Sequence, residues 1–382
     1  MAAHQPAKFL IDATAGARAE LSGVGRYVHE LVRALTELRA SGAAPPFELG
    51  VRLAKWSGRH ALPTTPLAKS GTDHLRIRRI DDRLDRFLLR DVALCHGLDA
   101  RITPVRRIAR VATLHDVFSL ERDDLAEASF RQKKRRQYRQ LADEADAVIC
   151  ISAATETGFL AEFPRARGRT HVIHHGIAPR FTRADDAAIA ALRQRLRLDR
   201  PFLLFVGLLS TRKNLLALLD AYALLAKAGG RELDLVLAGK PSHGFEAIEA
   251  ALARHPRRER IHLLGFVGDA ELTALYSAAE LFVFPSLSEG FGLPVLEAFA
   301  CGTGVVASEL PVLREIGGAE LVTADSRDAA ALASAIERAL PACRDDGARA
   351  RRRAHAAQFT WSATAAKTVA VWQTASERRA NR

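Results

Sequence analysis

The chain has 382 residues and a mass of 41.6 kDa, which suits two domains of about 150 to 200 residues each. Hydrophobic residues make up 48% of it and charged residues 26%, the composition of a globular protein, so wholesale disorder is excluded. No apolar run approaches the roughly 18 residues of a membrane-spanning helix, and the apolar run near the start, residues 9–11, is too short for a secretory signal. We therefore expect a cytoplasmic protein.

The net charge is +12. Residues 1–178 hold 29 Lys+Arg and 21 Asp+Glu, a net charge of +8, and residues 131–139 alone contain six cations. A positive net charge of this size is compatible with three kinds of partner: nucleic acid, an anionic membrane surface or phosphorylated small molecules.

The four cysteines, Cys95, Cys150, Cys301 and Cys343, are far apart in the chain. Because no Cys-x-x-Cys or Cys/His cluster with zinc spacing occurs, we expect reduced, buried thiols and no metal site. The chain also lacks an Asp-x-Asp pair, a phosphate-binding Gly-x4-Gly-Lys-Ser/Thr loop and a Gly-x-Ser-x-Gly elbow. A metal-bridged diphosphate, a P-loop and a hydrolase nucleophile are therefore not indicated, and no cofactor is expected.

In the first half, short apolar runs predict strands, and an i, i+3, i+4, i+7 apolar pattern predicts a helix after a glycine-containing loop. Strands are expected at residues 9–11, 47–53, 110–114 and 147–151, a helix at 26–38, and a long basic helix between the last two strands, with a weak apolar stripe of Phe130, Tyr138, Leu141 and Ala145.

The second half alternates strands and helices more plainly. Strands are expected at residues 201–206, 233–237, 261–264, 281–284, 305–307 and 321–323. Helices are expected at 214–228, stopped by Gly229-Gly230, at 245–254, at 269–279 with Asp269 as N-cap, at 294–300 and at 328–340.

Short, continuously apolar strands that alternate with helices indicate parallel sheets covered on both faces, an α/β fold. The polar stretch 174–199 predicts the domain boundary. We expect domains at 1–178 and 179–358, followed by closing helices, of which 359–382 is the last.

The most informative segment is Glu289-Gly-Phe-Gly-Leu-Pro-Val-Leu-Glu297, which follows a predicted strand and opens a predicted helix. Glycines at 290 and 292 allow a tight turn, and Pro294 suits the first helical turn. A helix N-terminus beside such a turn attracts phosphate. The carboxylates of Glu289 and Glu297 can accept hydrogen bonds from vicinal hydroxyls, so they are candidates for binding a ribose and a transferred sugar. The alternative is a loop with a capping glutamate.

Two cations, Arg212 and Lys213, follow another strand and precede a helix. Cations oppose the positive end of the helix dipole there, which is justified if a polyanion occupies the space. Arg and Lys both bind diphosphate well. The alternative is a solvated basic loop.

Two further positions lie in the first half. Gly23 and Gly25 resemble part of a dinucleotide fingerprint, but Val28 stands at the third glycine position, which argues against a nicotinamide site. His115 follows the strand 110–114, at the edge where α/β sheets bind ligands, although a structural role is equally compatible with its position.

These residues resemble the retaining glycosyltransferases of the GT-B fold, family 4. The segment from Glu289 to Glu297 is similar to that family's Glu-x7-Glu motif, and the resemblance covers nearly the whole chain. It implies two Rossmann-like domains that face each other across a deep cleft, with a C-terminal helix that crosses back to the first domain. The first domain would bind the acceptor and the second the nucleotide sugar.

The resemblance also implies roles for single residues. Arg212 and Lys213 would hold the donor diphosphate, Glu297 the ribose, and Glu289 the transferred sugar. The remaining donor-binding positions would be Gly23 and Gly25 in the first-domain glycine loop, Val267 near the base through its main chain, and the backbone N–H groups of Phe291, Gly292 and Leu293 at the sugar; His115 would lie near the sugar's 6-hydroxyl.

Two positions depart from the family pattern. Leu208 stands where many relatives carry an arginine, so Arg212 would substitute for it or Lys213 would act alone. His175 replaces an asparagine before the glycine of the linker.

The subgroup that the sequence most resembles is the bacterial mannosyltransferases of surface polysaccharide assembly. We therefore expect transfer of a hexose, first of all mannose from GDP-mannose, to a lipid-linked or polysaccharide acceptor. The alternatives are a UDP-sugar donor and a non-catalytic nucleotide- or nucleic-acid-binding protein, although no nucleic-acid module is recognisable. A lipid-linked acceptor would bring residues 131–139 to the anionic inner leaflet of the membrane, with Phe130 and Tyr138 adding apolar contact; the alternative for this stretch is a solvated helix face.

Overall fold

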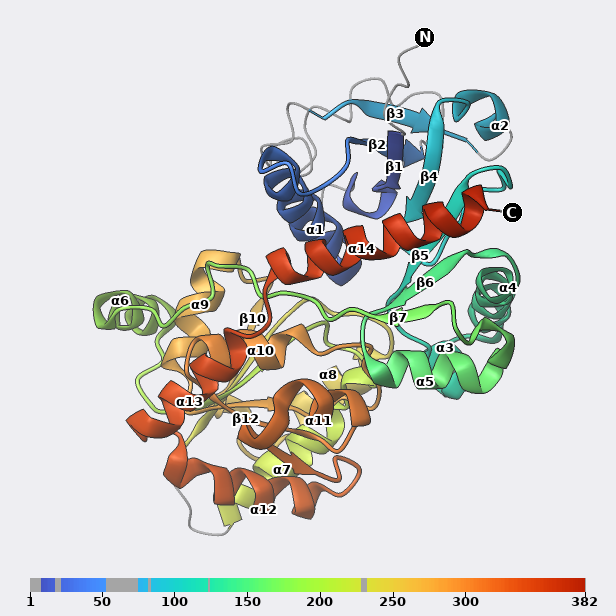
Figure 1. Ribbon diagram of the computed structural model, residues 1–382. Helices are drawn as coiled ribbons and strands as arrows, with labels where there is room; N and C mark the ends of the chain where they lie inside the picture. Colours follow the sequence, from blue (N-terminus) through green and yellow to red (C-terminus); the bar gives the residue numbers. More distant parts are fainter. Residues whose placement is uncertain are drawn as a thin grey trace. The chain divides into compact units, whose positions relative to one another are not determined.

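The computed structural model describes residues 8–17, 22–52, 75–81, 84–122, 124–227 and 232–381. The chain divides into two compact units (Figure 1). The first unit comprises Met1–Gly176 and Thr360–Arg382, and the second comprises Ile177–Phe359. In the described ranges, no helix is long and apolar enough to cross a membrane.

The first unit is built on a seven-stranded sheet in the order β3-β2-β1-β4-β5-β6-β7, and every strand pair described in it is parallel. Parallel strands buried on both faces are continuously apolar, which explains why the runs at β1, β5 and β6 are recognisable in the sequence. The strands are β1 (Lys8–Asp12), β2 (Phe47–Arg52), β3 (Ile77–Ile80), β4 (Val92–Gly97), β5 (Ala109–Leu114), β6 (Ala147–Cys150) and β7 (Thr170–Val172).

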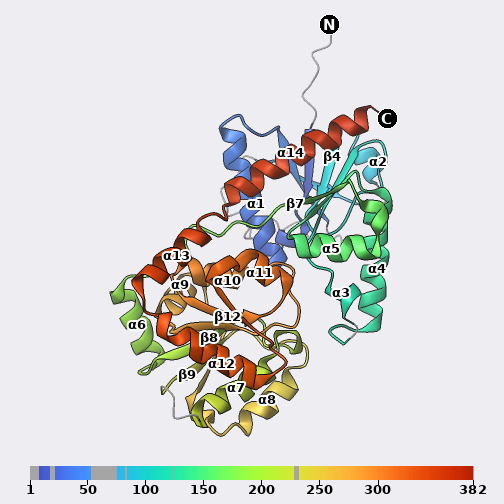
Figure 2. The same cartoon turned by 60° about the horizontal axis from the view of Figure 1, so that its bottom comes forward.

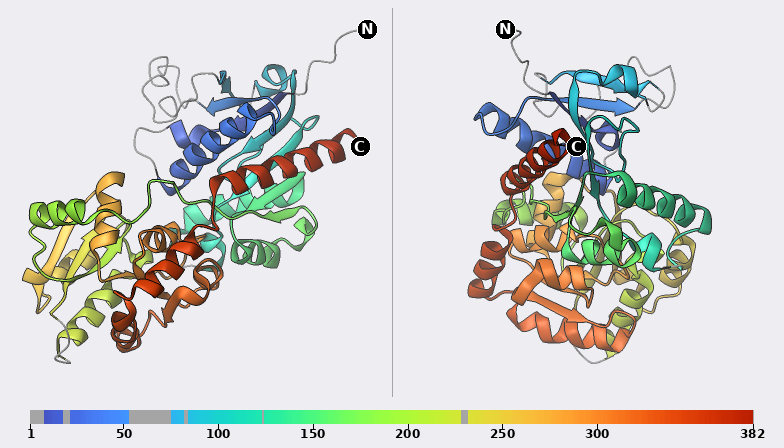
Figure 3. Two further views of the ribbon diagram at one scale, coloured as in Figure 1. Left: turned by 60° about the vertical axis from the view of Figure 1, so that its left-hand side comes forward. Right: turned by 45° about the vertical axis from the view of Figure 1, so that its right-hand side comes forward.

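Helices cover both faces of this sheet. One cluster of buried hydrophobic side chains, including Tyr27, Leu31 and Trp372, joins α1 and α14 to one face. A second such cluster, including Tyr138 and Phe159, joins α4 and α5 to the other face. Figure 3 shows α14, in red, running beside the strands of this unit although it ends the chain. The helices of the first unit are α1 (Gly23–Ala40), α2 (Asp85–Leu88), α3 (Phe118–Glu121), α4 (Ala128–Glu144), α5 (Ala153–Glu162) and α14 (Trp361–Ala380).

The second unit is a six-stranded parallel sheet in the order β10-β9-β8-β11-β12-β13, the doubly wound arrangement of Rossmann-type folds. Its strand order reverses between β8 and β11, so the carboxyl ends of these two strands form the position where such sheets bind ligands. The strands are β8 (Phe202–Val206), β9 (Asp234–Ala238), β10 (Ile261–Gly265), β11 (Leu281–Phe284), β12 (Gly304–Ser308) and β13 (Leu321–Ala324).

The helices of this unit form two layers. Figure 2 shows α7, α8 and α12 as one group, in which α7 packs against both of the others, whereas α10 packs against α9, α11 and α13. The helices are α6 (Asp186–Leu196), α7 (Leu215–Lys227), α8 (Phe245–Ala253), α9 (Asp269–Ala278), α10 (Leu293–Ala300), α11 (Pro311–Gly317), α12 (Ala329–Ala339) and α13 (Asp346–Ala356). The expected α/β fold with two Rossmann-like sheets is therefore confirmed.

Several details differ from the expectations. Helix α1 begins at Gly23, not at residue 26, because the Ser22 hydroxyl caps the helix by accepting a hydrogen bond from the Gly25 N–H. Helix α9 has Gly268 as N-cap, and Asp269 is its first residue. The polar stretch 174–199, in which the domain boundary was expected, contains α6. The expected stop at Gly229-Gly230 lies outside the described residues.

The expected burial of the cysteines is confirmed. All four are buried and none forms a disulfide. Burial raises the pKa of the Cys301 thiol to about 12, so it stays protonated at neutral pH.

Candidate active site

The N-terminus of α10 lies at the carboxyl end of β11. Gly292 is its N-cap with a φ of 101°, and Pro294 occupies the first turn. Phe291 is 3% exposed and packs edge-on against Phe359, so its main chain, not its ring, is the part that can meet a ligand. The first N–H groups and the dipole of a helix favour an anion at this end.

Arg212 and Lys213 lie in a short 3₁₀ helix, Thr211–Lys213, in the loop after β8. This loop is joined to the one after β11, because the Leu287 N–H donates to the Arg212 carbonyl (2.9 Å) and Arg212 Nη1 donates to the Ser288 carbonyl (2.7 Å). The ammonium group of Lys213 also lies 4.6 Å from the centroid of the Phe284 ring. Both cations are thus held at the switch point of the sheet.

Glu289 contacts both cations. One carboxylate oxygen accepts a hydrogen bond from Lys213 Nζ, and the other lies 3.4 Å from Arg212 Nη1. Burial by itself would raise the pKa of Glu289, but the charges of Lys213 and Arg212 outweigh it, so the pKa lies below its ordinary value. Burial lowers the pKa of Lys213, and Glu289 opposes this shift. The Glu289 carboxylate is therefore an anion that contacts both cations.

Glu297 lies in the second turn of α10 and is 7% exposed. Tyr276, on α9, donates its hydroxyl to a Glu297 oxygen at 3.1 Å. Tyr276 could not be recognised from the sequence, since its partner is 21 residues away and on another helix. Val267 lies farther along the sheet, half-buried between the edge strand β10 and α9.

In the first unit, the structure places Gly23 and Gly25 inside the first turn of α1 rather than in a loop. Gly23 is exposed and Gly25 is buried. Neither has a positive φ, so they do not form the tight glycine turn that their spacing suggested. Their expected place in a glycine loop is therefore wrong.

His115 directly follows β5, as expected from the sequence. Its Nε2 lies 2.8 Å from the Leu98 carbonyl; because a carbonyl only accepts, Nε2 carries the hydrogen and Nδ1 is left as an acceptor. Burial lowers the pKa of His115, so the ring is neutral at pH 7. Its ring meets Tyr27 edge-on, with 4.7 Å between the centroids.

A buried hydrogen-bonded chain, which the sequence analysis missed, runs behind this pair. Trp372 Nε1 donates to His96 Nδ1 (2.9 Å), so neutral His96 carries its hydrogen on Nε2 and donates it to Thr113 Oγ1 (2.9 Å). Thr113 Oγ1 in turn lies 3.1 Å from the Tyr27 hydroxyl. The four side chains come from α14, β4, β5 and α1, and each is at most 1% exposed. These hydrogen bonds thus hold the Tyr27 side chain beside His115.

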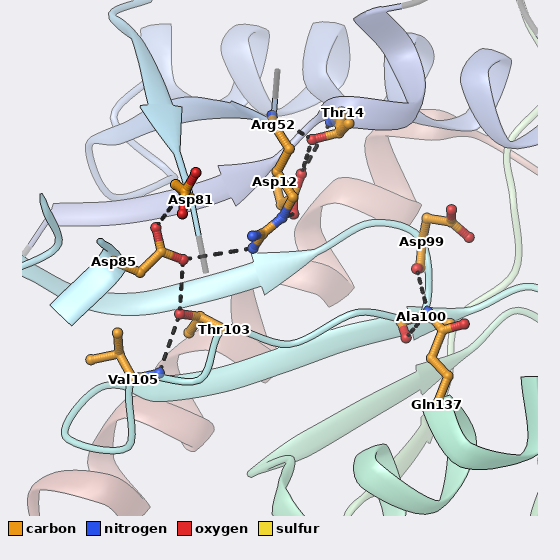
Figure 4. A network of polar contacts seen from close by, with 10 residues as sticks. All are labelled: Asp12, Thr14, Arg52, Asp81, Asp85, Asp99, Ala100, Thr103, Val105 and Gln137. Carbon is orange, nitrogen blue, oxygen red and sulfur yellow. Dashed lines mark hydrogen bonds and ion pairs between the residues drawn. The ribbon is translucent and has the colours of Figure 1, made fainter. Parts of the chain in front are cut away.

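A second network lies at the carboxyl ends of β1 and β2 (Figure 4). Arg52 Nε donates to Asp12 at 2.8 Å and Nη2 lies 3.7 Å from Asp85, which also accepts a hydrogen bond from Thr103 at 3.3 Å. Thr14 closes the network, because it donates to Asp12 at 2.5 Å and accepts from the Arg52 N–H. The network thus joins the ends of β1 and β2 to α2.

The comparisons with known proteins agree with this geometry. Residues 190–357 match the family described as Glycosyl transferases group 1, and residues 21–181 match Glycosyltransferase Family 4. The chain belongs to family 4 of the GT-B glycosyltransferases. It is therefore a transferase.

Three relatives illustrate the likeness. The O-antigen chain mannosyltransferase B of Escherichia coli is 27% identical over 94% of this chain and 98% of its own. The serotype-specific mannosyltransferase WbdA of E. coli is 31% identical over 67% of this chain, which spans only 32% of that protein. The crystal structure of HepE from Anabaena, in complex with UDP and glucose, superposes with a TM-score of 0.72 at 19% identity, over 96% of this chain and 98% of that one; it shows the shared fold alone.

Within this glycosyltransferase, the expected site residues fall into two groups. The structure brings Arg212, Lys213 and Glu289 into direct contact, and α10, the next helix along the chain, carries Leu293 and Glu297. His115, Gly23 and Gly25 belong to the first unit. Among the described residues, no cluster of three or more His, Cys, Asp and Glu side chains suits a metal ion.

Gly292→Ala is expected to destabilise the second unit. A Cβ atom at Gly292 would lie 2.5 Å from Leu313 Cδ2, and the φ of 101° is unfavourable for any other residue. Backbone strain of this kind costs about 1 to 3 kcal/mol, so the thermal midpoint of the second unit should fall. The matched control is Gly23→Ala, because Gly23 is helical and a Cβ there meets nothing within 4 Å. An unchanged midpoint for Gly292→Ala would show that the turn tolerates a side chain.

The buried histidines predict acid sensitivity of the first unit. Burial, with a contribution from His115, lowers the pKa of His96 from 6.5 to about 3. The unfolded chain therefore binds a proton below pH 6.5 that the folded chain does not accept until about pH 3. The stability contributed by neutral His96 is fully present above pH 6.5. It is lost as the pH falls from 6.5 towards about 3, by up to about 1.4 kcal/mol per pH unit.

Urea unfolding followed by tryptophan fluorescence measures this effect, since Trp361 and Trp372 belong to the first unit. His96→Gln should be less stable at neutral pH but should show a shallower loss of stability on acidification. Exposed His243, changed to Gln, is the control and should keep the original slope. Equal slopes for His96→Gln and the unchanged protein would contradict the assignment.

Proposed function

We propose that this glycosyltransferase moves a hexose, with retention of configuration, from a nucleotide sugar to a lipid-linked or polysaccharide acceptor in cell-surface glycan assembly. The first-choice donor is GDP-mannose; the relatives named as mannosyltransferases support mannose as the transferred sugar. The second is a UDP-sugar, which the complex of HepE with UDP and glucose supports. In this proposal residues 1–178 bind the acceptor, residues 179–358 bind the donor, and residues 359–382 complete the first domain.

The observation that carries the proposal is the contact of Lys213 and Arg212 with Glu289 beside the N-terminus of α10. Two cations and a helix dipole converge on one place, which suits a diphosphate. In the proposed donor complex, Arg212 and Lys213 bind the diphosphate, and Glu289 binds hydroxyls of the transferred sugar. The N–H groups of Phe291, Gly292 and Leu293 assist at the sugar.

The remaining residues have narrower proposed roles. Glu297, oriented by Tyr276, accepts hydrogen bonds from the ribose hydroxyls, and the main chain at Val267 meets the base. His115, with Tyr27 fixed beside it, lies near the sugar's 6-hydroxyl. Gly23 and Gly25, in the first turn of α1, are the proposed donor-binding positions of the first unit.

The proposed reaction is direct displacement on one face of the sugar. The bond between the anomeric carbon and the phosphate oxygen breaks, and the diphosphate keeps the electron pair. The acceptor hydroxyl oxygen attacks the anomeric carbon from the same face, and its proton passes to the departing phosphate oxygen. The sugar becomes oxocarbenium-like, so the protein's main task is to stabilise the charge that grows on the diphosphate. Arg212, Lys213 and the α10 dipole meet this need.

A donor panel tests the proposal. The protein is incubated with GDP-mannose, UDP-glucose and ADP-glucose, and release of the nucleoside diphosphate is measured with and without a polyisoprenoid-linked saccharide. Release from GDP-mannose, with less from UDP-glucose, is the expected result. Glu297→Gln should weaken binding of free GDP, since the ribose is its partner. No binding or turnover of any nucleotide sugar would overturn the proposal.

We also propose that the basic face of α4 holds the enzyme at an anionic membrane surface. Lys133, Arg136 and Arg139 are exposed on this helix, and Phe130 is 40% exposed. Tyr138, expected to add apolar contact with the membrane, is buried at 2% exposure and donates to the Asp116 carbonyl, so that expectation is wrong. Each cation near such a surface contributes about 1 kcal/mol.

The membrane prediction is tested by sedimentation with phosphatidylglycerol-containing vesicles. Changing Lys133, Arg136 and Arg139 to Gln should reduce cosedimentation at low salt, and high salt should reduce it for the unchanged protein, because charges are screened over about 8 Å at physiological ionic strength. The control removes the same charge from the second unit by changing Arg254, Arg327 and Arg338, which are also exposed. Equal loss in both variants, or none in either, would contradict a role for this face.

A further inference from the structure

Three loops lie side by side at the carboxyl ends of β8, β9 and β10. The Leu209 N–H donates to the Lys240 carbonyl at 2.9 Å, and the Gly239 N–H donates to the Gly265 carbonyl at 2.7 Å. These bonds join the loop that carries Arg212 and Lys213 to the loop after β9, and that loop to the one after β10. The three loops therefore form one continuous edge that starts at the cation pair.

The side chains on this edge are unusually exposed for their type. Phe266 is 66% exposed and Leu208 is 52% exposed. Lys240, also exposed, places its ammonium group 5.3 Å from the centroid of the Phe266 ring. An exposed aromatic ring with a cation over its face offers both a flat apolar surface and hydrogen-bond donors.

The distance along this edge from β8 to β10 is comparable with the length of a nucleoside. Neighbouring strands lie about 4.8 Å apart, so β10 lies about 10 Å from β8 across β9. This is comparable with the reach from a diphosphate to the far edge of the base of the same nucleotide. A nucleoside diphosphate held by Lys213 can therefore extend along these loops toward Lys240 and Phe266.

We propose that Lys240, set against Phe266, selects a donor whose base carries a keto oxygen, guanine or uracil, over one that carries an amino group there, adenine or cytosine. This inference rests on the proposed nucleotide-sugar site. A lysine ammonium has three donors and no acceptor. Guanine presents the acceptors O6 and N7 and uracil presents O4, whereas adenine and cytosine present amino donors at the corresponding positions. An ammonium group thus bonds to the keto bases and opposes the amino bases.

The selection accounts for the two donors of the proposed function together. GDP-mannose and UDP-sugars differ in sugar and in base size, but both bases carry a keto oxygen at the discriminating position. Phe266 adds surface for stacking, which any base accepts, so it contributes affinity without discrimination.

The test is calorimetric titration of GDP, UDP, ADP and CDP into the unchanged protein and into Lys240→Met and Lys240→Glu. The methionine keeps an apolar stem against Phe266 and removes the donors, and the glutamate accepts from amino groups. The unchanged protein should prefer GDP and UDP; Lys240→Met should lower the ratio of GDP to ADP affinity about fivefold, and Lys240→Glu should lower it further. Removing the positive charge of Lys240 weakens GDP and ADP alike through their phosphates. This loss therefore cancels in the ratio of the two affinities.

Two controls keep the test decisive. Arg254→Met removes an exposed cation at the C-terminal end of α8, away from this edge, and should leave the ratio unchanged. Phe266→Leu should weaken all four nucleotides alike. An unchanged ratio in Lys240→Met, or no preference for keto bases in the unchanged protein, overturns the inference while nucleotide binding itself stands. Failure of all four nucleotides to bind overturns the proposed function and this inference with it.

Discussion

Lys213→Met is expected to lower turnover of the nucleotide sugar by at least tenfold, because one lost charged contact is worth about 1.5 to 3 kcal/mol. It should also destabilise the second unit, since Lys213 and Glu289 each expose only 9% of their side chains. Removing one partner of a buried ion pair leaves the other charge uncompensated, at a cost of about 3 to 5 kcal/mol. Steady-state kinetics and thermal unfolding measure the two effects.

The double variant Lys213→Met/Glu289→Gln separates function from folding. It removes both charges, so it should regain much of the lost stability, because a neutral buried pair avoids the desolvation cost. It should not regain turnover, since the diphosphate contact is still missing. Full activity in the stable double variant would remove Lys213 from the diphosphate site.

Glu289→Gln is expected to tighten binding of free GDP by about tenfold while it impairs transfer. In the structure the Glu289 carboxylate occupies the anionic position beside Lys213 and Arg212. A diphosphate must therefore displace an ion pair before it binds, and the amide of glutamine competes less strongly than a carboxylate. Transfer should fall because the sugar hydroxyls lose a charged acceptor.

Calorimetric titration with GDP, together with single-turnover kinetics, measures both parts of this prediction. Glu249→Gln, at an exposed position on α8, removes the same charge away from the site and should change neither quantity. Weaker GDP binding by Glu289→Gln would show that the carboxylate assists the nucleotide rather than competing with it.

Much of the second unit can be predicted from the sequence because its signals are local. Each buried parallel strand is a short apolar run, and the turn from Glu289 to Glu297 combines glycines, a proline and two carboxylates within nine residues. The helix expected at 294–300 is present and begins one residue earlier, at Leu293.

Contacts over long sequence distances could not be predicted. The contact between Lys213 and Glu289 joins positions 76 residues apart, and the bond between Trp372 and His96 joins positions 276 apart. From the sequence, the cations and Glu289 were assigned separate ligands, so their contact with each other was missed. The start of α1 was misplaced for a local reason, since two glycines suggest a loop and the capping bond of Ser22 outweighs their low helix propensity.

Arg212, Lys213 and Glu289 are proposed to form one nucleotide-diphosphate site. Calorimetric titration of GDP into Glu289→Gln and into Lys213→Met/Glu289→Gln, both shown by thermal unfolding to be folded, tests this directly, because the two proteins differ only in the Lys213 charge. Saturable binding of one GDP per chain by Glu289→Gln and at least about tenfold weaker binding by the double variant are expected. Equal affinity of the two folded proteins for GDP would rule out Lys213 as a diphosphate ligand.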